Sequence, residues 1–313
     1  MDAVINVALP FFALVFGGYG AARFKVMEAP MTRGLNSFVF YFSLPAMLFV
    51  ALAKAPITET FDWRFLAGYY AATLVVYAVA AVSGRVLFRS SLGVMGLQGM
   101  AATFGNVGYM GLPICFAVFG EAGMLPAVLI LVVDNIILNG LTIAALEAGK
   151  GGRGRLGETV RKVLLGMAKH PLLIAIYAGM AFAVAGPSVP EPIEAFLRLL
   201  GGAAAPCALF ALGATLAHQP VGRDMGDVAL LAFLKLYLHP LAVWVGVKQV
   251  FAVDEIFVGV AMIQAAMPIA ASVFVMATQY QLYAARVSTA VLASTAIAVV
   301  SVSAAIAHYA PTP

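Results

Sequence analysis

The chain has 313 residues, of which 63% are hydrophobic and only 10% are charged. Because a soluble domain is about half apolar and about a quarter charged, this composition excludes a soluble globular protein. The net charge of +4 comes from the segments between apolar runs. It therefore bears on membrane topology and predicts no nucleic-acid partner.

Apolar runs of about twenty residues, the length that crosses a bilayer, recur from one end of the chain to the other. They predict an all-α polytopic membrane protein. No basic segment precedes the first run, which is long for a signal peptide, so we expect it to be retained as a span. The ten predicted spans are 3–22, 34–53, 65–87, 94–119, 124–146, 169–186, 193–217, 228–250, 255–277 and 284–307.

The longest polar connector carries the run GKGGRGR and divides the chain into five spans plus five. We expect a first five-helix repeat over 1–149, a basic cytoplasmic linker over 150–168, and a second repeat over 169–313. Two halves with an odd number of spans have opposite orientations in the membrane. The weak similarity of FSLPAMLFVAL to AAPCALFALGA and of MGLPICFAVFG to AAMPIAASVFV supports such an inverted repeat.

The basic residues between the spans fall mainly on one side of the membrane. Thirteen Lys and Arg lie on one side, four lie on the other, and Lys235 lies inside a span. Because basic loops stay in the cytoplasm, both termini are predicted to lie outside.

The fourth span contains GNVGYMGLP, residues 105–113, although Gly and Pro weaken a helix by about 1 and about 3 kcal/mol. Pro113 cannot donate to the carbonyl of Tyr109, and Pro268 in the ninth span cannot donate to that of Gln264. We expect both spans to be broken crossover helices. Backbone freed at membrane depth is tolerated only where protein or a wet cavity satisfies it.

Two half-helices beginning after Gly111 and Met267 would point their positive N-terminal ends at one point, which suits an anion. Amide side chains lie beside both breaks, and the glycines permit close approach of a ligand. The predicted substrate-binding residues are Asn106, Gly108, Gly111, Pro113, Gln264 and Pro268.

Ionisable residues inside the predicted spans are candidates for ion coupling or charge compensation. Asp134 can carry a coupling proton, bind a cation, repel the wrong substrate, or serve as a structural counter-charge. Lys235 can attract an anion, pair with Asp134, balance free carbonyl ends, or extend to the cytoplasmic face. His239 either titrates near neutral pH or is simply packed. The hydroxyls of the last span, Ser294 and Ser301 among them, either pack or bond the crossover.

Other protein classes fit less well. Cys115 and Cys207 lie inside apolar runs and are expected to be neither a disulfide nor a metal site. The run Val107-Gly108-Tyr109 is similar to a potassium-channel filter, but it lies inside a full-length span. The absence of G-x-S-x-G and H-E-x-x-H motifs argues against an enzyme, and no cofactor or metal is expected.

NVGYMGLP resembles the N-x-x-x-M-G-[IL]-P signature of the auxin efflux carrier family, which includes bacterial malonate and malate permeases. MPIAASVFVMATQY is similar to the family's second crossover segment at Pro268, Phe274, Ala277 and Tyr280, and FSLPAMLF fits its second span. The short central loop favours the bacterial branch, and hence a location in the bacterial cytoplasmic membrane. The third span lacks an acidic residue that some plant members have.

The resemblance implies two broken helices crossing at mid-membrane, a scaffold domain of spans 1, 2, 6 and 7, a transport domain of spans 3–5 and 8–10, and a homodimer. It also implies a secondary transporter that moves a small organic anion, a mono- or dicarboxylate, by an elevator-like mechanism. Coupling to H⁺ or Na⁺ stays open. The alternative is a sodium-coupled symporter of the bile-acid type, which shares the crossed-helix plan.

Overall fold

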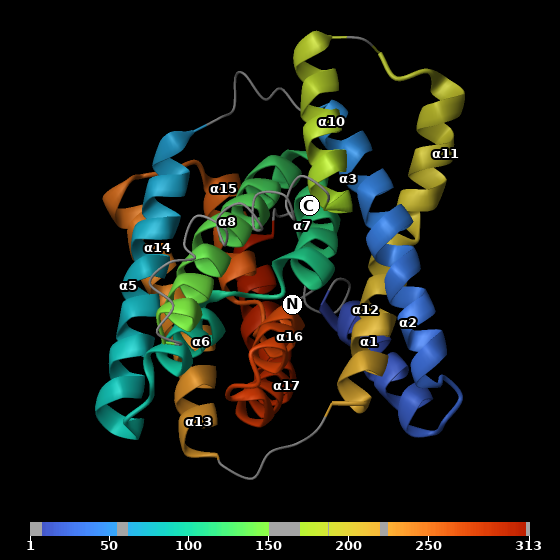
Figure 1. Ribbon diagram of the computed structural model, residues 1–313. Coiled ribbons are helices and arrows are strands. Elements are labelled where there is room, and N and C mark those ends of the chain that lie inside the picture. The colour runs from blue at the N-terminus through green and yellow to red at the C-terminus, as the bar shows by residue number, and fades with distance from the viewer. Residues whose placement is uncertain (1–7, 55–61, 150–169, 187, 220–224, 311–313) are drawn as a thin grey trace.

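The computed structural model describes residues 8–54, 62–149, 170–186, 188–219 and 225–310, and the regular secondary structure of these residues is helical (Figure 1). The helices of the first half are α1 (Leu9–Arg23), α2 (Ala29–Phe38), α3 (Leu44–Ala53), α5 (Trp63–Phe88), α6 (Leu92–Thr103), α7 (Leu112–Phe119) and α8 (Met124–Gly149). Those of the second half are α10 (Pro171–Ala185), α11 (Glu191–Gly202), α12 (Ala204–Ala217), α13 (Gly226–Phe233), α14 (His239–Trp244), α15 (Glu255–Ala265), α16 (Ala271–Gln279) and α17 (Ala284–Tyr309).

Short helical segments of other pitch join several of these helices into longer runs. The π-helical segments are η2 (Val39–Ser43), η3 (Val107–Gly111), η5 (Leu234–Leu238) and η6 (Val245–Val250), and η4 (Gly120–Gly123) is a 3₁₀ turn. Pro45, Pro113 and Pro240 each occupy the second position of a helix that directly follows a π-helical segment. Proline lacks the N–H that would continue the α-helical pattern, and the wider turn accommodates it without ending the helix.

Six helical runs are long and apolar enough to cross a membrane: 29–53, 63–88, 107–149, 191–217, 226–250 and 284–309. The prediction of an all-helical, multi-pass membrane protein is therefore confirmed. The described parts of other predicted spans are shorter. Helix α1 has 15 residues, α10 has 15 and α15 has 11. A 15-residue helix rises about 22 Å, less than the about 30 Å of a hydrocarbon core. The ten-span inverted repeat stays a prediction.

The helices pack in two groups that lie beside each other in Figure 1. In the α12 group, α1 and α2 pack on α12, and α3 packs on α10 and α11. In the α17 group, α5 packs on α6 and α14, α6 packs on α8, and α13, α15 and α16 pack on α17. The groups meet where α12 contacts η3 and α7, and where α3 contacts α8.

Helices α1 and α12 approach so closely that two glycines leave no room for a side chain. A Cβ added to Gly18 would lie 1.9 Å from the backbone oxygen of Phe210, and one added to Gly213 would lie 1.8 Å from that of Val15. Small residues at such positions allow close backbone packing between membrane helices.

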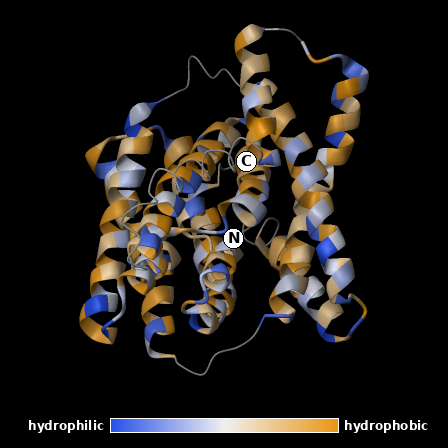
Figure 2. Cartoon of the chain, in the orientation of Figure 1, coloured by the Kyte–Doolittle hydropathy of each residue, from blue (hydrophilic) through white to orange (hydrophobic). Residues whose placement is uncertain are grey.

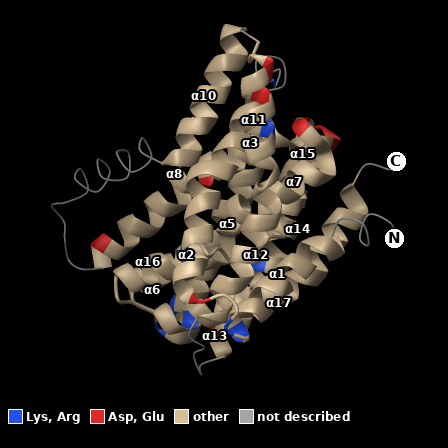
Figure 3. Ribbon diagram, turned by 90° about the vertical axis from the view of Figure 1, so that its right-hand side faces the viewer, with Lys and Arg blue, Asp and Glu red and all other residues tan. Residues whose placement is uncertain are grey.

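The outer surface is suited to lipid. Large apolar side chains such as Phe24, Val86 and Leu199 are exposed, and Figure 2 shows hydrophobic residues along the lengths of the helices. Charged side chains gather toward the two ends of the molecule (Figure 3). At one end, Arg198 pairs with both Glu121 and Glu194.

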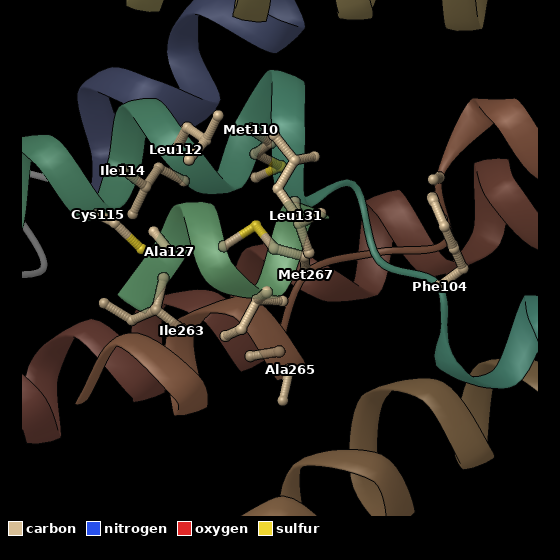
Figure 4. Packing of buried hydrophobic residues seen from close by; sticks show 14 of the residues in the cluster. Phe104, Met110, Leu112, Ile114, Cys115, Ala127, Leu131, Ile263, Ala265 and Met267 are labelled. Atoms are coloured by element: carbon tan, nitrogen blue, oxygen red, sulfur yellow. The ribbon is translucent and has the colours of Figure 1, made fainter. Parts of the chain in front are cut away.

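Buried apolar residues of η3, α7, α8 and α15 pack together in the core (Figure 4). Met110, Cys115, Ala127 and Ile263 are all fully buried there. Cys115 and the half-buried Cys207 are free thiols.

Candidate functional site

Two helical runs are interrupted within the α17 group. Helix α6 ends at Thr103 and helical structure resumes at Val107. Helix α15 ends at Ala265 and α16 begins at Ala271. The expectation that half-helices begin after Gly111 and Met267 is therefore wrong. Pro113 lies within a continuous helical run, because a π-helical turn precedes it.

The segments that interrupt the helices, residues 104–106 and 266–270, pair with each other. Gly105 and Ile269 form an isolated antiparallel bridge. The Asn106 N–H donates to the Pro268 carbonyl at 2.8 Å, and the Ala270 N–H donates to the Phe104 carbonyl at 3.1 Å. Each break therefore satisfies backbone groups of the other, as a membrane interior requires.

Side chains of α17 support the second break. Ser294 Oγ accepts from the Ile269 N–H at 3.1 Å, and Ser301 Oγ donates to the Ala266 carbonyl at 3.2 Å. Of the two roles expected for these hydroxyls, the structure shows hydrogen bonds to the interrupted segment. Helix α17 thereby fixes the position of residues 266–270.

A cavity of about 350 Å³ lies against the paired breaks, where the two helix groups meet. Among the described residues, its lining includes no Lys, Arg, Asp or Glu. One wall comes from the breaks, a second from α8, and a third from the α12 group and the residue before α10. The lining residues are Asn36, Phe40, Phe104, Gly105, Asn106, Val107, Gly108, Tyr109, Leu131, Asn135, His170, Leu172, Leu212, Thr215, Ala270, Ala271, Ser272 and Val275.

Two helix N-termini contribute to this cavity. Val107 and Gly108 open η3, and Ala271 and Ser272 open α16. The first N–H groups of a helix have no partner within the helix, and this end carries partial positive charge. An uncharged cavity bounded by two such ends favours a negatively charged ligand.

The predicted site residues lie at different places around the breaks. Asn106 and Gly108 line the cavity, and the Asn106 carbonyl accepts from the N–H groups of Met110 and Gly111. Pro113 lines a separate cavity of about 520 Å³ between α7, α3 and α11. Pro268 is paired with Asn106 inside the crossing.

Gln264 is fully buried and lies against η3. A Cβ added to Gly111 would come within 2.0 Å of Gln264 Oε1, so Gly111 provides the space for this amide. Neither residue lines the first cavity. No hydrogen-bond partner is found for either polar atom of the Gln264 side chain within the described part of the chain. A direct contact of Gln264 with substrate stays a prediction.

Other polar cavity residues were not predicted. Asn36 Nδ2 donates to Thr215 Oγ1 at 3.0 Å, which links α2 to α12 on the wall facing the breaks. Asn135 donates to the Leu131 carbonyl at 2.7 Å. Asn36 and Thr215 could have been noticed in the sequence, because each is a polar residue within an apolar run. The sequence carries no sign that they face residue 106.

The three ionisable candidates lie outside the cavity lining. Asp134, Lys235 and His239 are buried, and none lines the cavity. Lys235 Nζ donates to the Ala265 carbonyl at 2.7 Å and lies 3.1 Å from His239 Nδ1. Asp134 Oδ1 accepts from the Tyr70 hydroxyl at 2.9 Å. Lys235 thus does not extend to the cytoplasmic face.

Residues 3–306 match the family described as "Membrane transport protein". The chain belongs to this family. It is the auxin efflux carrier family that the sequence motifs indicated.

Known proteins resemble the chain along nearly its whole length. It is 31% identical over 303 residues to the "Putative malonate transporter" of Rhizobium meliloti (strain 1021), covering 97% of this chain and 95% of that protein. It is 24% identical over 309 residues to the "Uncharacterized transporter YfdV" of Escherichia coli (strain K12), with 92% of each chain covered. The "Lysosomal cholesterol signaling protein" of Mus musculus is 24% identical over 306 residues, which is 35% of its length. These similarities show a membrane transport protein.

Proposed function

We propose that the protein is a secondary transporter of a small organic anion, a mono- or dicarboxylate. The observation that carries the proposal is the cavity of about 350 Å³ bounded by the N-terminal ends of η3 and α16. A carboxylate there would accept hydrogen bonds from the first N–H groups of both segments. The Asn106 side chain lines the same space and offers two further donors.

Malonate is the first substrate to test. The relative from Rhizobium meliloti, 95% of whose length is covered by the match, bears the name "Putative malonate transporter". A three-carbon diacid is also far smaller than the cavity. Asn36, Asn135 and Ser272 supply polar atoms on the other walls. These could hold a second carboxylate without a formal counter-charge.

An elevator-like movement would follow from the two helix groups. The α12 group contains the helices of predicted spans 1, 2, 6 and 7, and the α17 group contains the others. In this proposal the α12 group is the scaffold and the α17 group carries the breaks and substrate past it. The inverted repeat, the bacterial inner membrane, the outside termini and the homodimer remain part of the same proposal.

The test is ligand-dependent stability of the purified protein. Melting temperatures would be recorded with malonate, malate, succinate, acetate, indole-3-acetate, a bile acid and NaCl. A ligand that binds only the folded state raises the free energy of unfolding in proportion to the logarithm of the ligand concentration. Asn106→Ala is expected to weaken carboxylate binding about 10- to 150-fold, because a hydrogen bond to a charged group contributes roughly 1.5–3 kcal/mol.

Gln279→Ala is the matched control, because Gln279 is an exposed amide side chain of α16 that does not line the cavity. A carboxylate shift that is weakened in Asn106→Ala and retained in Gln279→Ala supports the proposal. Equal affinity in both variants would show that the anion binds elsewhere. A shift with the bile acid and NaCl alone would favour a sodium-coupled symporter of the bile-acid type instead.

A further inference from the structure

The helix ends that precede the breaks meet on the side of the crossing where Lys235 lies. Ala265 is the last residue of α15, and its carbonyl is one of the C-terminal groups that lack a partner inside the helix. Lys235 Nζ donates to it at 2.7 Å. A Cβ added to Gly105, two residues after the end of α6, would lie 3.2 Å from the same Nζ.

The two sides of the crossing therefore carry opposite partial charges. The N-terminal ends of η3 and α16 border the cavity, while Lys235 lies at the C-terminal end of α15 and beside Gly105, which follows α6. Helix C-termini carry partial negative charge, so they favour a cation as the cavity favours an anion. In transporters with broken helices, such carbonyl ends are where a mobile Na⁺ or H⁺ binds.

Hydrogen bonds hold the Lys235 side chain in this place. Thr73 Oγ1 donates to the Tyr69 carbonyl at 2.8 Å, so its lone pairs can accept from His239 Nε2 at 3.1 Å. A His239 ring protonated at Nε2 presents an acceptor at Nδ1, and Nδ1 lies 3.1 Å from Lys235 Nζ. The ring thus orients the ammonium toward Ala265.

Asp134 supplies the opposite charge. Its Oδ1 accepts from Tyr70, and its Oδ2 has no hydrogen-bond partner within the described residues. No basic group of the described chain lies within 4 Å of it. Asp134 and Lys235 are both buried and have opposite formal charges, and opposite charges attract each other over longer distances in a medium of low dielectric constant. Because a single buried charge in a membrane is costly, each of the two groups lowers the cost of the other.

We propose that the Lys235 ammonium is a built-in cation that occupies the place where a mobile cation would bind at the crossing. The protein then binds no alkali cation at this site. If the proposed transport function is right, its transport needs no Na⁺. Removal of the side chain in Lys235→Ala would open a cation site lined by the Ala265 carbonyl and His239 Nδ1.

The experiment measures melting temperature without any substrate, so it does not depend on the proposed function. Wild type and Lys235→Ala would be compared in N-methylglucamine chloride and in NaCl, LiCl or methylammonium chloride at equal ionic strength. We expect no cation-specific shift for wild type. We expect Lys235→Ala to be less stable in N-methylglucamine and to recover by about 5 °C with a small cation.

Three further variants test the interpretation. Lys235→Met fills the space with an uncharged side chain and is expected to lose stability without recovery by any cation. Lys235→Arg keeps the charge and is expected to stay insensitive to cations. Lys248→Ala, in the same helical run but paired with Glu255 at the helix end, is expected to show no cation-specific recovery.

Either of two results would overturn the proposal. The first is a wild-type protein whose melting temperature rises specifically with Na⁺, a measurement that stands even if Lys235→Ala does not fold. The second is a Lys235→Ala protein as stable as wild type in N-methylglucamine. Failure of carboxylates to bind in the separate assay would remove the proposed substrate class but would leave these results unaffected.

Discussion

Replacing Gly18 by alanine tests how closely α1 and α12 are packed. The added Cβ would lie 1.9 Å from the Phe210 carbonyl oxygen, whereas real Cβ atoms essentially never come closer than 3.0 Å. The two backbones must therefore separate by about 1 Å, since no rotamer change can relieve contact with a backbone atom. Overpacking of this kind costs about 1–3 kcal/mol, and we expect the upper end.

Gly20→Ala is the matched control, because Gly20 lies two residues further along the same helix and a Cβ there would meet nothing within 4 Å. Alanine at this position is expected to raise stability by up to about 1 kcal/mol through its better helix propensity. The two variants should then differ by about 3 kcal/mol, or roughly 6–12 °C in melting temperature. Thermal unfolding in detergent measures this difference. Equal melting temperatures for the two variants would refute the close approach of α1 and α12.

Two other substitutions test the buried polar groups around the breaks by the same measurement. Gly111→Ala places a Cβ against the Gln264 amide and is expected to lower stability by about 1–3 kcal/mol. The double variant with Gln264→Ala should regain most of this loss, and strict additivity would contradict the contact. Tyr70→Phe removes the hydroxyl that lies 2.9 Å from Asp134 Oδ1 and 2.8 Å from the Ile130 carbonyl oxygen. The loss should cost about 1.5–3 kcal/mol, because a hydrogen bond to the carboxylate is charge-assisted. A cost below about 1 kcal/mol would mean that the hydroxyl donates to the Ile130 carbonyl instead.

Much of the helical layout could be predicted from hydropathy alone. The predicted spans 65–87 and 284–307 match α5 and α17 to within two residues at each end. Both are long apolar runs without proline, so nothing competes with the hydrophobic signal. The short described helices, such as α15, could not be distinguished from full spans in this way.

The location of the first break could not be predicted from local residues. Pro113 is the strongest helix breaker in its span, yet a π-helical turn before it keeps the helix continuous. The actual break lies around Gly105, where the backbone pairs with Ile269. That pairing joins residues far apart in the chain, so no local propensity reports it.

The candidate site shows the same limit. Asn106 could be proposed from its place beside a predicted break, and it lines the cavity. Asn36 and Thr215 come from α2 and α12, and they reach the cavity only because the two helix groups pack against each other. Side chains assembled by packing between distant spans leave no pattern in a single sequence.

The pairing of the two breaks has a consequence for how the protein is made. When the first half enters the membrane, the Asn106 N–H and the Phe104 carbonyl have no strand to pair with, because Pro268 and Ala270 are not yet synthesised. Unpaired backbone groups are costly in hydrocarbon. The first half alone should therefore stay bound to the insertion and quality-control machinery until residues 266–270 have been synthesised. The two halves expressed as separate chains should accumulate only when they are produced together.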